Sequence, residues 1–485
     1  MNVLHISTCD LRGGAARAAW RLHEGLRAAG THSRMLVHDR ASADETVAAI
    51  SAADSPGRAK IRRVLERMER QCIHQRRRPV SNTYFSLPVP DLDLSAHPWV
   101  RAADVIHLHW VAGMLAPGGV AALRSLKKPV VWTLHDQRAF TGGCHFSAGC
   151  HGYEKDCAAC PQLTEDPNGL TRAVLADAIA TLPGCDITVV CPSRWLADCA
   201  RRSAVFSGAR VEVIPYGLDT RVFRPYGKAE ARTALDLDPD AVCFLFGADR
   251  CSEQRKGFGK MAEAIGAALK DAEFREGVRT GRIAFVSFGE VGRQFAELPV
   301  PIRCLERVDS DATLATICSA ADALLFTSLE DNLPNVLFEA MCCGTPTLAF
   351  DVGGVPDIVT HKTTGLLVPP GDCAKFAASM RRLASDPGLR GHLHRNCAES
   401  VPARFDLGIQ ASRYLALYRS ITSDGSAMQS ATLPATAPVL GFGREFADVF
   451  SRFAFQSERN WLRKLLACPA SRRSKRNNPH TTANQ

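Results

Sequence analysis

Long apolar runs are missing from this chain of 485 residues. No stretch of about 18 apolar residues occurs, so we expect no membrane-spanning helix. The first ten residues, MNVLHISTCD, lack a charged segment followed by an apolar run, so we expect no secretory signal peptide. A cytoplasmic protein is therefore predicted. Its 18 cysteines should be mostly reduced and buried, not joined in a disulfide framework.

Three other features that the chain lacks narrow its function. There is no internal repeat of solenoid period. The pair Gly13 and Gly14 is not part of a G-x-G-x-x-G motif, which disfavours a dinucleotide site. The basic segment 57–78 has no interleaved aromatic residues, which disfavours nucleic acid as a partner. The net charge of +9 suits phosphates, nucleotides or lipid headgroups without choosing between them.

Short apolar runs alternate with segments of helical period along most of the chain. Such alternation is typical of an α/β protein with parallel sheets. The apolar runs at 2–7, 105–110, 129–136, 187–193 and 211–217 predict strands, and 14–30 predicts a helix. The pattern restarts with strands at 242–250, 283–290, 322–328, 347–354 and 365–372. The chain is also too long for one ordinary core, so two α/β domains are predicted.

The composition changes after the last helical segment, which covers 408–420. We predict a first domain over 1–220, a second over 221–405, a helix over 406–420, and a linker with a basic, partly disordered tail over 421–485. Within that tail, residues 445–467 could form an amphipathic helix.

Two acids, with seven residues between them, stand in SLEDNLPNVLFEAMCCGTP, residues 328–346. Pro334 suits the first turn of a helix, and Asp331 and Asn332 are residues that often cap one. Glu339 would then lie inside the helix, whose N-terminus favours an anion. Two carboxylates flanking an anion site would suit a sugar, a diphosphate and a ribose. The alternative is that Asp331 only caps the helix and Glu339 is solvated.

Cations follow the first predicted strand of the second domain. The stretch DRCSEQRKGFGKM, residues 249–261, supplies Arg250, Arg255 and Lys256. Cations just past the carboxyl end of a strand lie at the ligand-binding edge of a parallel sheet, where they could neutralise a diphosphate leaving group. A basic surface loop is the alternative.

Taken together, these motifs resemble glycosyltransferase family 4. The resemblance rests first on an acid that is followed, after seven intervening residues, by Glu, by Ala-Met and by a Cys-Gly-Thr-Pro turn. It rests also on the stretches GGVPDIV (353–359), TGLLVPPGD (364–372) and VIPYGLDT (213–220), and on the RKG sequence. It covers about residues 1–420. The family implies a retaining enzyme of the GT-B fold, with two Rossmann-like domains. The stretches HLHW, TLHDQRAFTGGCHF, CPQL and EDNLPN are most similar to enzymes of exopolysaccharide assembly of the colanic acid type.

The resemblance also implies roles for the donor-side residues. Glu339 would bind the ribose hydroxyls, and Asp331, the residue that the NLPN spacing aligns in preference to Glu330, would meet the donor sugar. Asn332 and Leu333 would complete the donor pocket at the helix mouth. Lys256 and an arginine would stabilise the diphosphate without a metal. The family's arginine position is Cys251 here, so Arg250 and Arg255 are both candidates.

In the first domain the resemblance places His135 against the donor sugar and the acceptor, and Gly13 and Gly14 close to the diphosphate. The donor would be a UDP or GDP sugar, the acceptor a saccharide or a polyprenyl-diphosphate saccharide, and the helix 406–420 would cross back to the first domain. No cofactor would be required for catalysis. A nucleotide-sugar epimerase of the same fold and an inactive nucleotide-binding scaffold are the alternatives.

Four cysteines gather in GGCHFSAGCHGYEKDCAACPQL. They are Cys144, Cys150, Cys157 and Cys160. Four thiolates would suit a zinc ion, which would be structural because four ligands leave no open position. A cysteine-rich loop without metal, or a disulfide pair, are the alternatives.

The segment 57–78 holds nine Lys or Arg and two Glu, with apolar residues at helical spacing. Basic amphipathic helices of this kind bind membrane surfaces, so peripheral contact with the inner membrane face is one prediction. An ordinary helix whose apolar stripe packs on the domain is the other.

Overall fold

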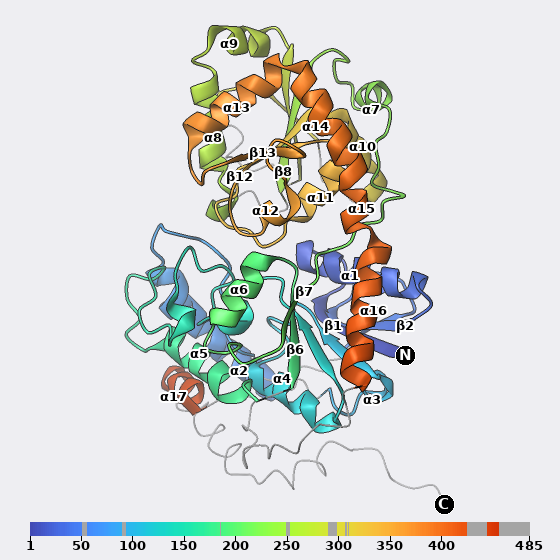
Figure 1. Cartoon of the computed structure of the whole chain (residues 1–485). Coiled ribbons are helices and arrows are strands. Elements are labelled where there is room, and N and C mark those ends of the chain that lie inside the picture. Colours follow the sequence, from blue (N-terminus) through green and yellow to red (C-terminus); the bar gives the residue numbers. More distant parts are fainter. Residues whose placement is uncertain are drawn as a thin grey trace, which may run out of the picture.

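The protein is described here from a computed structural model. The structure describes residues 1–50, 56–89, 94–184, 186–248, 253–289, 298–305, 308, 310–423 and 444–454. Arg250 and most of the predicted tail lie outside these ranges, so the predictions made for them lie outside the described residues. Figure 1 shows two bodies stacked one above the other.

The first body is built on a sheet of seven parallel strands in the order β3-β2-β1-β4-β5-β6-β7. The strands are β1 (Asn2–Cys9), β2 (His32–Asp39), β3 (Val47–Ala49), β4 (Val105–Leu108), β5 (Val130–Thr133), β6 (Ile187–Cys191) and β7 (Val211–Val213). Neighbouring residues such as Val105 and Ile106 belong to two different core clusters, because successive side chains of a strand point to opposite faces. Burial on both faces explains the continuous apolar runs.

Helices cover both faces of this sheet. The helices of this domain are α1 (Gly14–Ala28), α2 (Pro56–Met68), α3 (Pro98–Ala102), α4 (Pro117–Leu123), α5 (Leu170–Thr181) and α6 (Arg194–Arg202), of which α2 packs in a separate cluster and not on the sheet. Leu22 and Leu26 of α1 pack on one face with α16 (Leu407–Ser423), whereas α4, α5 and α6 contribute to the core on the other face.

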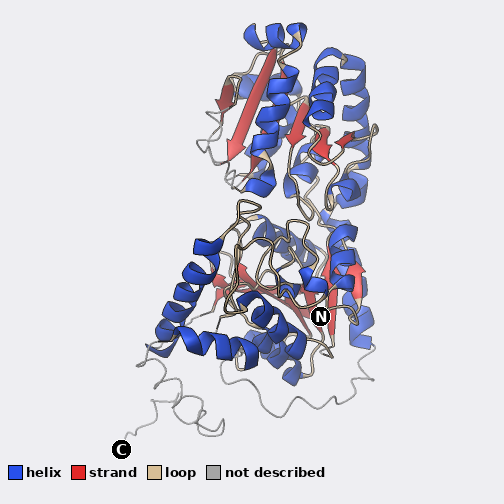
Figure 2. Ribbon diagram, turned by 90° about the vertical axis from the view of Figure 1, so that its left-hand side faces the viewer, coloured by secondary structure: helices blue, strands red, loops and turns tan. Residues whose placement is uncertain are grey.

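The second body contains a sheet of six parallel strands in the order β10-β9-β8-β11-β12-β13. Its strands are β8 (Val242–Ala248), β9 (Ile283–Gly289), β10 (Ile302–Cys304), β11 (Ala323–Phe326), β12 (Thr347–Phe350) and β13 (Gly365–Val368). Its helices are α7 (Lys228–Ala234), α8 (Phe258–Ala268), α9 (Ala272–Arg279), α10 (Asp311–Ala320), α11 (Asn335–Cys342), α12 (Val355–Ile358), α13 (Cys373–Ser385), α14 (Pro387–Ser400) and α15 (Pro402–Phe405). Two parallel-sheet domains of the Rossmann type, and hence the predicted fold class, are confirmed, and Figure 2 shows the strands of each domain among its helices.

The chain passes between the domains twice, and the two passages touch. Leu218 on the outgoing passage and Asp406 on the returning one are bridged as parallel strands. Beyond Asp406, α16 packs on the first domain, where the Tyr414 hydroxyl lies 2.8 Å from Thr133 Oγ1 and the Tyr418 hydroxyl 2.7 Å from His107 Nδ1. The predicted return of this helix to the first domain is therefore confirmed.

The basic segment 57–78 is helical over most of its length, because α2 continues into a π-helical turn (Glu69–Ile73) and a 3-10 turn (His74–Arg76), but its apolar stripe is not free. The α-helix ends at Met68, and Ile61, Val64 and Met68 are each at most 3% exposed. They pack with Phe446 and Phe450 of α17 (Arg444–Phe453) in a separate core cluster. The apolar stripe therefore packs in the interior of the protein, as the second alternative predicted, and peripheral membrane contact of this segment stays a prediction. Among the described residues, no helix combines the length and hydropathy that a bilayer crossing needs.

Buried imidazoles predict how stability depends on pH. Burial lowers the pKa of five histidines, and for His23 and His135 it lowers the pKa to about 4. The five are His5, His23, His107, His109 and His135. The unfolded chain binds protons at these rings below about pH 6.5, whereas the folded chain does not. Their stability contribution is therefore intact above about pH 6.5 and is lost as pH falls toward 4, by about 1.4 kcal/mol per imidazole per pH unit.

Urea unfolding of the full chain between pH 7.5 and 5 should show this loss as a falling midpoint. His23→Gln should make the fall shallower, while the matched change at exposed His32, His32→Gln, should leave it unchanged. A midpoint that stays constant across this pH range would contradict the prediction.

Candidate active site

The loops after the central strands of both sheets meet at the junction between the domains. In a sheet of this topology, ligands bind beyond the carboxyl ends of the strands, where the strand order reverses. That point lies between β1 and β4 in the first sheet and between β8 and β11 in the second. Gly13 follows β1, Lys256 follows β8, and Asp331 follows β11. The predicted residues thus lie at the edge where this fold binds ligands.

Asp331 is a buried carboxylate held by two cations. Its Oδ2 accepts hydrogen bonds from Lys256 Nζ at 2.7 Å and from Arg255 at 3.1 Å, and its Oδ1 accepts the Asn332 backbone N–H at 3.0 Å. Burial alone would raise the pKa of Asp331, but Lys256 and Arg255 outweigh it and hold the pKa below its usual value. The carboxylate is therefore ionised, and a new anion here would compete with it for both cations.

Close backbone packing fixes these loops and explains two of the glycine motifs. A Cβ at Gly257 would lie 1.9 Å from the Thr327 carbonyl oxygen, and the residue has φ +69°. A Cβ at Gly353 would lie 1.9 Å from the Asp331 carbonyl oxygen, and one at Gly354 would lie 1.8 Å from that of Asn332. The RKG and GGVP motifs therefore let two neighbouring loops press directly on the loop that carries Asp331.

The helix after Asp331 begins later than predicted. The first residue of α11 is Asn335, and Pro334 holds the N-cap position, so the predicted capping by Asp331 and Asn332 is wrong. Asn332 instead joins the domains: its Nδ2 donates to the His135 carbonyl oxygen at 3.0 Å, and its Oδ1 accepts from Ser193 Oγ at 2.6 Å. The Leu333 side chain packs in the core of the second domain, so only its backbone could meet a ligand.

Glu339 lies inside α11, as predicted, but its partner comes from the first domain. Arg21 of α1 donates to Glu339 Oε1 at 2.8 Å and also pairs with Asp311 at 3.3 Å. Arg21 and Glu339 are 6% and 4% exposed. A ribose bound at Glu339 would have to share this carboxylate with Arg21.

The sequence motifs do not predict Arg21 as a site residue, although the pattern of α1 contains a signal for it. It lies three residues after Ala18 and four before Gly25, on the face of α1 that is buried. A lone arginine inside an apolar helical stripe requires a buried acid as its partner. The sequence does not say which acid supplies it, because Glu339 lies in the other domain.

His135 lies at the junction with both ring nitrogens engaged. Its Nδ1 lies 2.7 Å from the Tyr216 hydroxyl, and its Nε2 lies 3.1 Å from His109 Nδ1. Its lowered pKa makes the ring neutral near pH 7. Contact of the ring nitrogens with a donor sugar remains a prediction, and it would require one of these two hydrogen bonds to break.

The glycine pair after β1 also reaches the second domain. Gly13 has φ +87°, and the Gly14 carbonyl oxygen accepts a hydrogen bond from Asn335 Nδ2 at 3.0 Å. Gly14 thus lies beside the first turn of α11, on the side of the junction where Glu339 and Arg21 meet.

A cavity of about 50 Å³ opens in the first domain beside His135. Its walls come from the carboxyl ends of β4 and β5, and include Trp110, Trp132, Asp136 and Arg138. The Trp110 indole N–H donates to Asp136 at 2.8 Å, which orients one wall of the cavity. Aromatic rings with a few fixed polar groups are the usual lining of small-ligand sites.

The acid next to Asp331 has a different task. Glu330 accepts the Ala148 backbone N–H at 2.9 Å, so it ties the second domain to a loop of the first. Burial raises its pKa. The Arg255 guanidinium lies over the Phe146 ring, 4.0 Å from its centroid. Arg255 and Lys256 both donate to the Asp331 carboxylate, whereas Glu330 accepts from Arg255 only through its backbone carbonyl oxygen.

Comparisons with known proteins agree with this geometry. Residues 12–222 match the family described as Glycosyltransferase Family 4, and residues 242–386 match Glycosyl transferases group 1. The D-inositol 3-phosphate glycosyltransferase of Acidothermus cellulolyticus is 31% identical over 346 residues, which is 66% of this chain and 68% of that protein. The enzyme of the same name from Actinosynnema mirum is 34% identical over 199 residues, 39% of this chain and 46% of that protein. The match thus spans about half the length of some of these relatives.

Solved structures share the fold. Sucrose-phosphate synthase from Thermosynechococcus elongatus aligns with a TM-score of 0.59 at 21% identity, over 87% of this chain and 100% of that one. Anabaena HepE, solved in complex with UDP-glucose, aligns with a TM-score of 0.58 at 15% identity, over 87% and 100%. At these identities the likeness concerns the fold alone. Together with the sequence matches, it shows that the chain belongs to the family 4, group 1, glycosyltransferases and has the GT-B fold.

Two glycines that are two positions apart in the sequence provide a matched test of the loop packing. Gly257→Ala should destabilise the protein by more than the 1–2 kcal/mol or so that left-handed backbone alone costs, because its Cβ also meets a backbone oxygen. Gly259→Ala, in the first turn of α8 with open space around its Cβ, should be neutral or stabilising by up to about 1 kcal/mol. Urea unfolding of both variants measures the difference, and equal midpoints would contradict it.

Proposed function

We propose that this protein is a retaining hexosyltransferase that takes a hexose from a UDP or GDP sugar and transfers it, without a catalytic metal, to a saccharide acceptor in exopolysaccharide assembly. One observation carries the proposal: Lys256 and Arg255 converge on Asp331 at the ligand-binding edge of the second sheet. Two cations and an ionised acid at that place suit a sugar diphosphate, with positive charge for the phosphates and a hydrogen-bond acceptor for the sugar hydroxyls.

Each part of the donor has a partner at the junction. The diphosphate would take Lys256 and Arg255 from Asp331, which frees the Asp331 carboxylate for hydroxyls of the hexose. Glu339 would accept hydrogen bonds from the ribose hydroxyls while Arg21 keeps its charge balanced. UDP-glucose is one donor to test first, because it is the ligand of the HepE structure that shares this fold.

The transfer breaks the bond between the anomeric carbon and the diphosphate oxygen and forms one from that carbon to an acceptor hydroxyl oxygen. The proton of that hydroxyl passes to the leaving diphosphate on the same face of the sugar, which retains the anomeric configuration. Lys256 and Arg255 stabilise the charge that develops on the leaving group. His135, neutral and hydrogen-bonded through both nitrogens, orients Asn332 through its carbonyl oxygen.

The acceptor would enter from the first domain, through the cavity walled by Trp110 and Trp132. A lipid-diphosphate saccharide at the inner membrane face is the acceptor that the exopolysaccharide resemblance favours. The names of the sequence relatives favour a second candidate, an inositol phosphate. Parallel assays with a polyprenyl-diphosphate saccharide and with inositol 3-phosphate would separate the two.

Lys256→Ala should lower kcat by about 100-fold or more, because it removes a charge that acts on the leaving group. Lys260→Ala, one turn further along the chain in α8 and ion-paired with surface Glu263, should keep the rate. Product formation from radiolabelled UDP and GDP sugars measures both, in buffer with and without added Mg²⁺. Equal activity of the two variants would overturn the assignment of Lys256, and a strict need for added Mg²⁺ would overturn metal independence.

Glu339→Gln should weaken donor binding by roughly 10-fold or more, since charged hydrogen bonds to the ribose become neutral ones. Glu263→Gln is the matched surface control. Thermal shift on addition of UDP, GDP and their sugars gives the readout. A shift with one base that Glu339→Gln loses supports the donor site. Donor turnover without any acceptor would instead indicate an epimerase, and binding without turnover of any donor would indicate a scaffold.

A further inference from the structure

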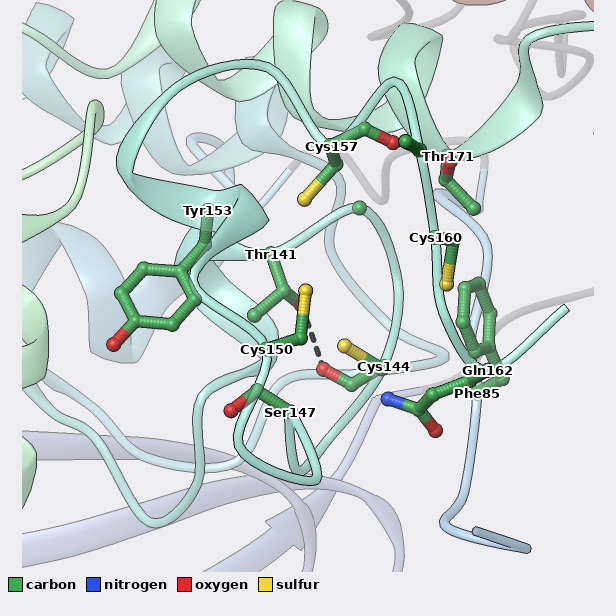
Figure 3. A pocket seen from close by; sticks show the side chains of 12 residues that line it. Phe85, Thr141, Cys144, Ser147, Cys150, Tyr153, Cys157, Cys160, Gln162 and Thr171 are labelled. Atoms are coloured by element: carbon green, nitrogen blue, oxygen red, sulfur yellow. Dashed lines mark hydrogen bonds between the residues drawn. The ribbon is translucent and has the colours of Figure 1, made fainter. Parts of the chain in front are cut away.

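Four cysteine side chains surround one small cavity in the first domain. They are Cys144, Cys150, Cys157 and Cys160, and are called the cysteine cluster below. Figure 3 shows their sulfur atoms gathered around a common space. The cavity has a volume of about 20 Å³, enough for one water-sized group or ion. All four come from the segment 141–169 that leads to α5, so a single loop supplies the whole set.

Backbone amides point at these sulfurs. The Gly152 N–H donates to Cys150 Sγ at 3.2 Å. Backbone N–H groups of Gly142 and Gln162 likewise donate to Cys157 and Cys160. Amide hydrogen bonds favour sulfur in its charged form, which is the form that binds a metal. They supply the outer-sphere support that holds metal ligands in place.

Without an ion, the same site is unfavourable for thiolates. Cys144 is buried and the other three thiols are half-buried around the same cavity, so four thiolates would bring like charges together away from water. A divalent cation reverses this balance, because its charge offsets the thiolates and deprotonates them outright. Zinc prefers four thiolate sulfurs in a closed tetrahedral site.

We propose that the cysteine cluster binds one Zn²⁺ as a structural site. The four thiolates supply every ligand and leave no position for a substrate. No three of the four sulfurs lie within 4.8 Å of one another in this structure, so binding would have to draw them inward around the cavity that they share. The ion would cross-link a loop whose internal backbone hydrogen bonds each span at most five residues.

A cluster of histidines is the competing metal site, and it fits less well. Among the described residues, His5, His107 and His109 have ring nitrogens within 4.8 Å of one another. Five of their six ring nitrogens are already hydrogen-bonded, however, and only His5 Nε2 lacks a partner among the described residues. Three neutral rings in an apolar core would also leave the double charge of the ion uncompensated.

The loop that the ion would hold reaches the donor side of the junction. Ser147 and Ala148 contact the Glu330 carboxylate, and the Phe146 ring lies under the guanidinium of Arg255. Gly142 and Gly143 allow this loop to pack, because a Cβ there would lie 2.4 Å from the Thr171 carbonyl oxygen and 2.3 Å from the Phe85 ring, respectively. Zinc would therefore stiffen the surface that faces the cations around Asp331.

The test is the metal content of the full-length protein, purified without chelator from zinc-supplemented cells and measured by plasma mass spectrometry. We expect one zinc per chain in the wild type. The double change Cys157→Ser with Cys160→Ser should reduce zinc at least tenfold, whereas Cys304→Ser, an exposed cysteine in β10, should keep it. Zinc that is absent from the wild type, or retained in the double variant, would overturn the proposal.

A second measurement covers a double variant that fails to fold. Zinc is released from wild-type protein with a mercurial, the thiols are restored with reductant, and Co²⁺ is added. Binding should give the intense visible bands of tetrahedral cobalt with thiolate-to-cobalt charge transfer. A colourless protein, or disulfides within the cysteine cluster found by peptide mapping under non-reducing conditions, would overturn the proposal. Neither readout depends on transferase activity, so both stand apart from the proposed function.

Discussion

The ion pair between buried Asp331 and the cations Lys256 and Arg255 is the constraint on which the site depends. Removing three charged groups from water is costly, and only their mutual attraction and exact hydrogen bonding repay it. The loop after β11 therefore has one stable position. Its backbone is pressed by Gly353 and Gly354, and its next residue, Asn332, reaches Ser193 and His135. The arrangement of both domains around this loop follows from it.

Much of the fold could be predicted from the sequence, because buried parallel strands are continuous apolar runs that a reader can find. The strands at 105–108 and 323–326 are examples. The strands β2, β3 and β10 were not predicted. Polar residues interrupt the apolar pattern of β2, and β3 and β10 are edge strands of three residues that give little pattern. The helix start at Asn335 was placed too early, because Asp331 and Asn332 look like caps, but tertiary ion pairing and interdomain hydrogen bonds take their side chains elsewhere.

The site was predictable where its residues are close in sequence, as with Arg255 and Lys256, and not where two distant segments meet. Arg21 and Glu339 form an ion pair between the two domains, and the sequence around either residue does not indicate the other as its partner. The same holds for the apolar stripe of α2, whose pattern suits a membrane surface and a protein core equally well. Its actual partner, α17, lies near the other end of the chain, with Phe446 and Phe450 against Val64.

The bridge between Leu218 and Asp406 places both connections between the domains along one line. A body joined to another along a single line can rotate about that line more easily than it can slide. The second domain should therefore rotate about this line as a hinge, and the hinge lies on the side of α16. The Arg21–Glu339 pair joins helices α1 and α11, and the Asn332 bridges join the loop after β11 to the first domain, so a rotation that separates the domains would have to break these contacts.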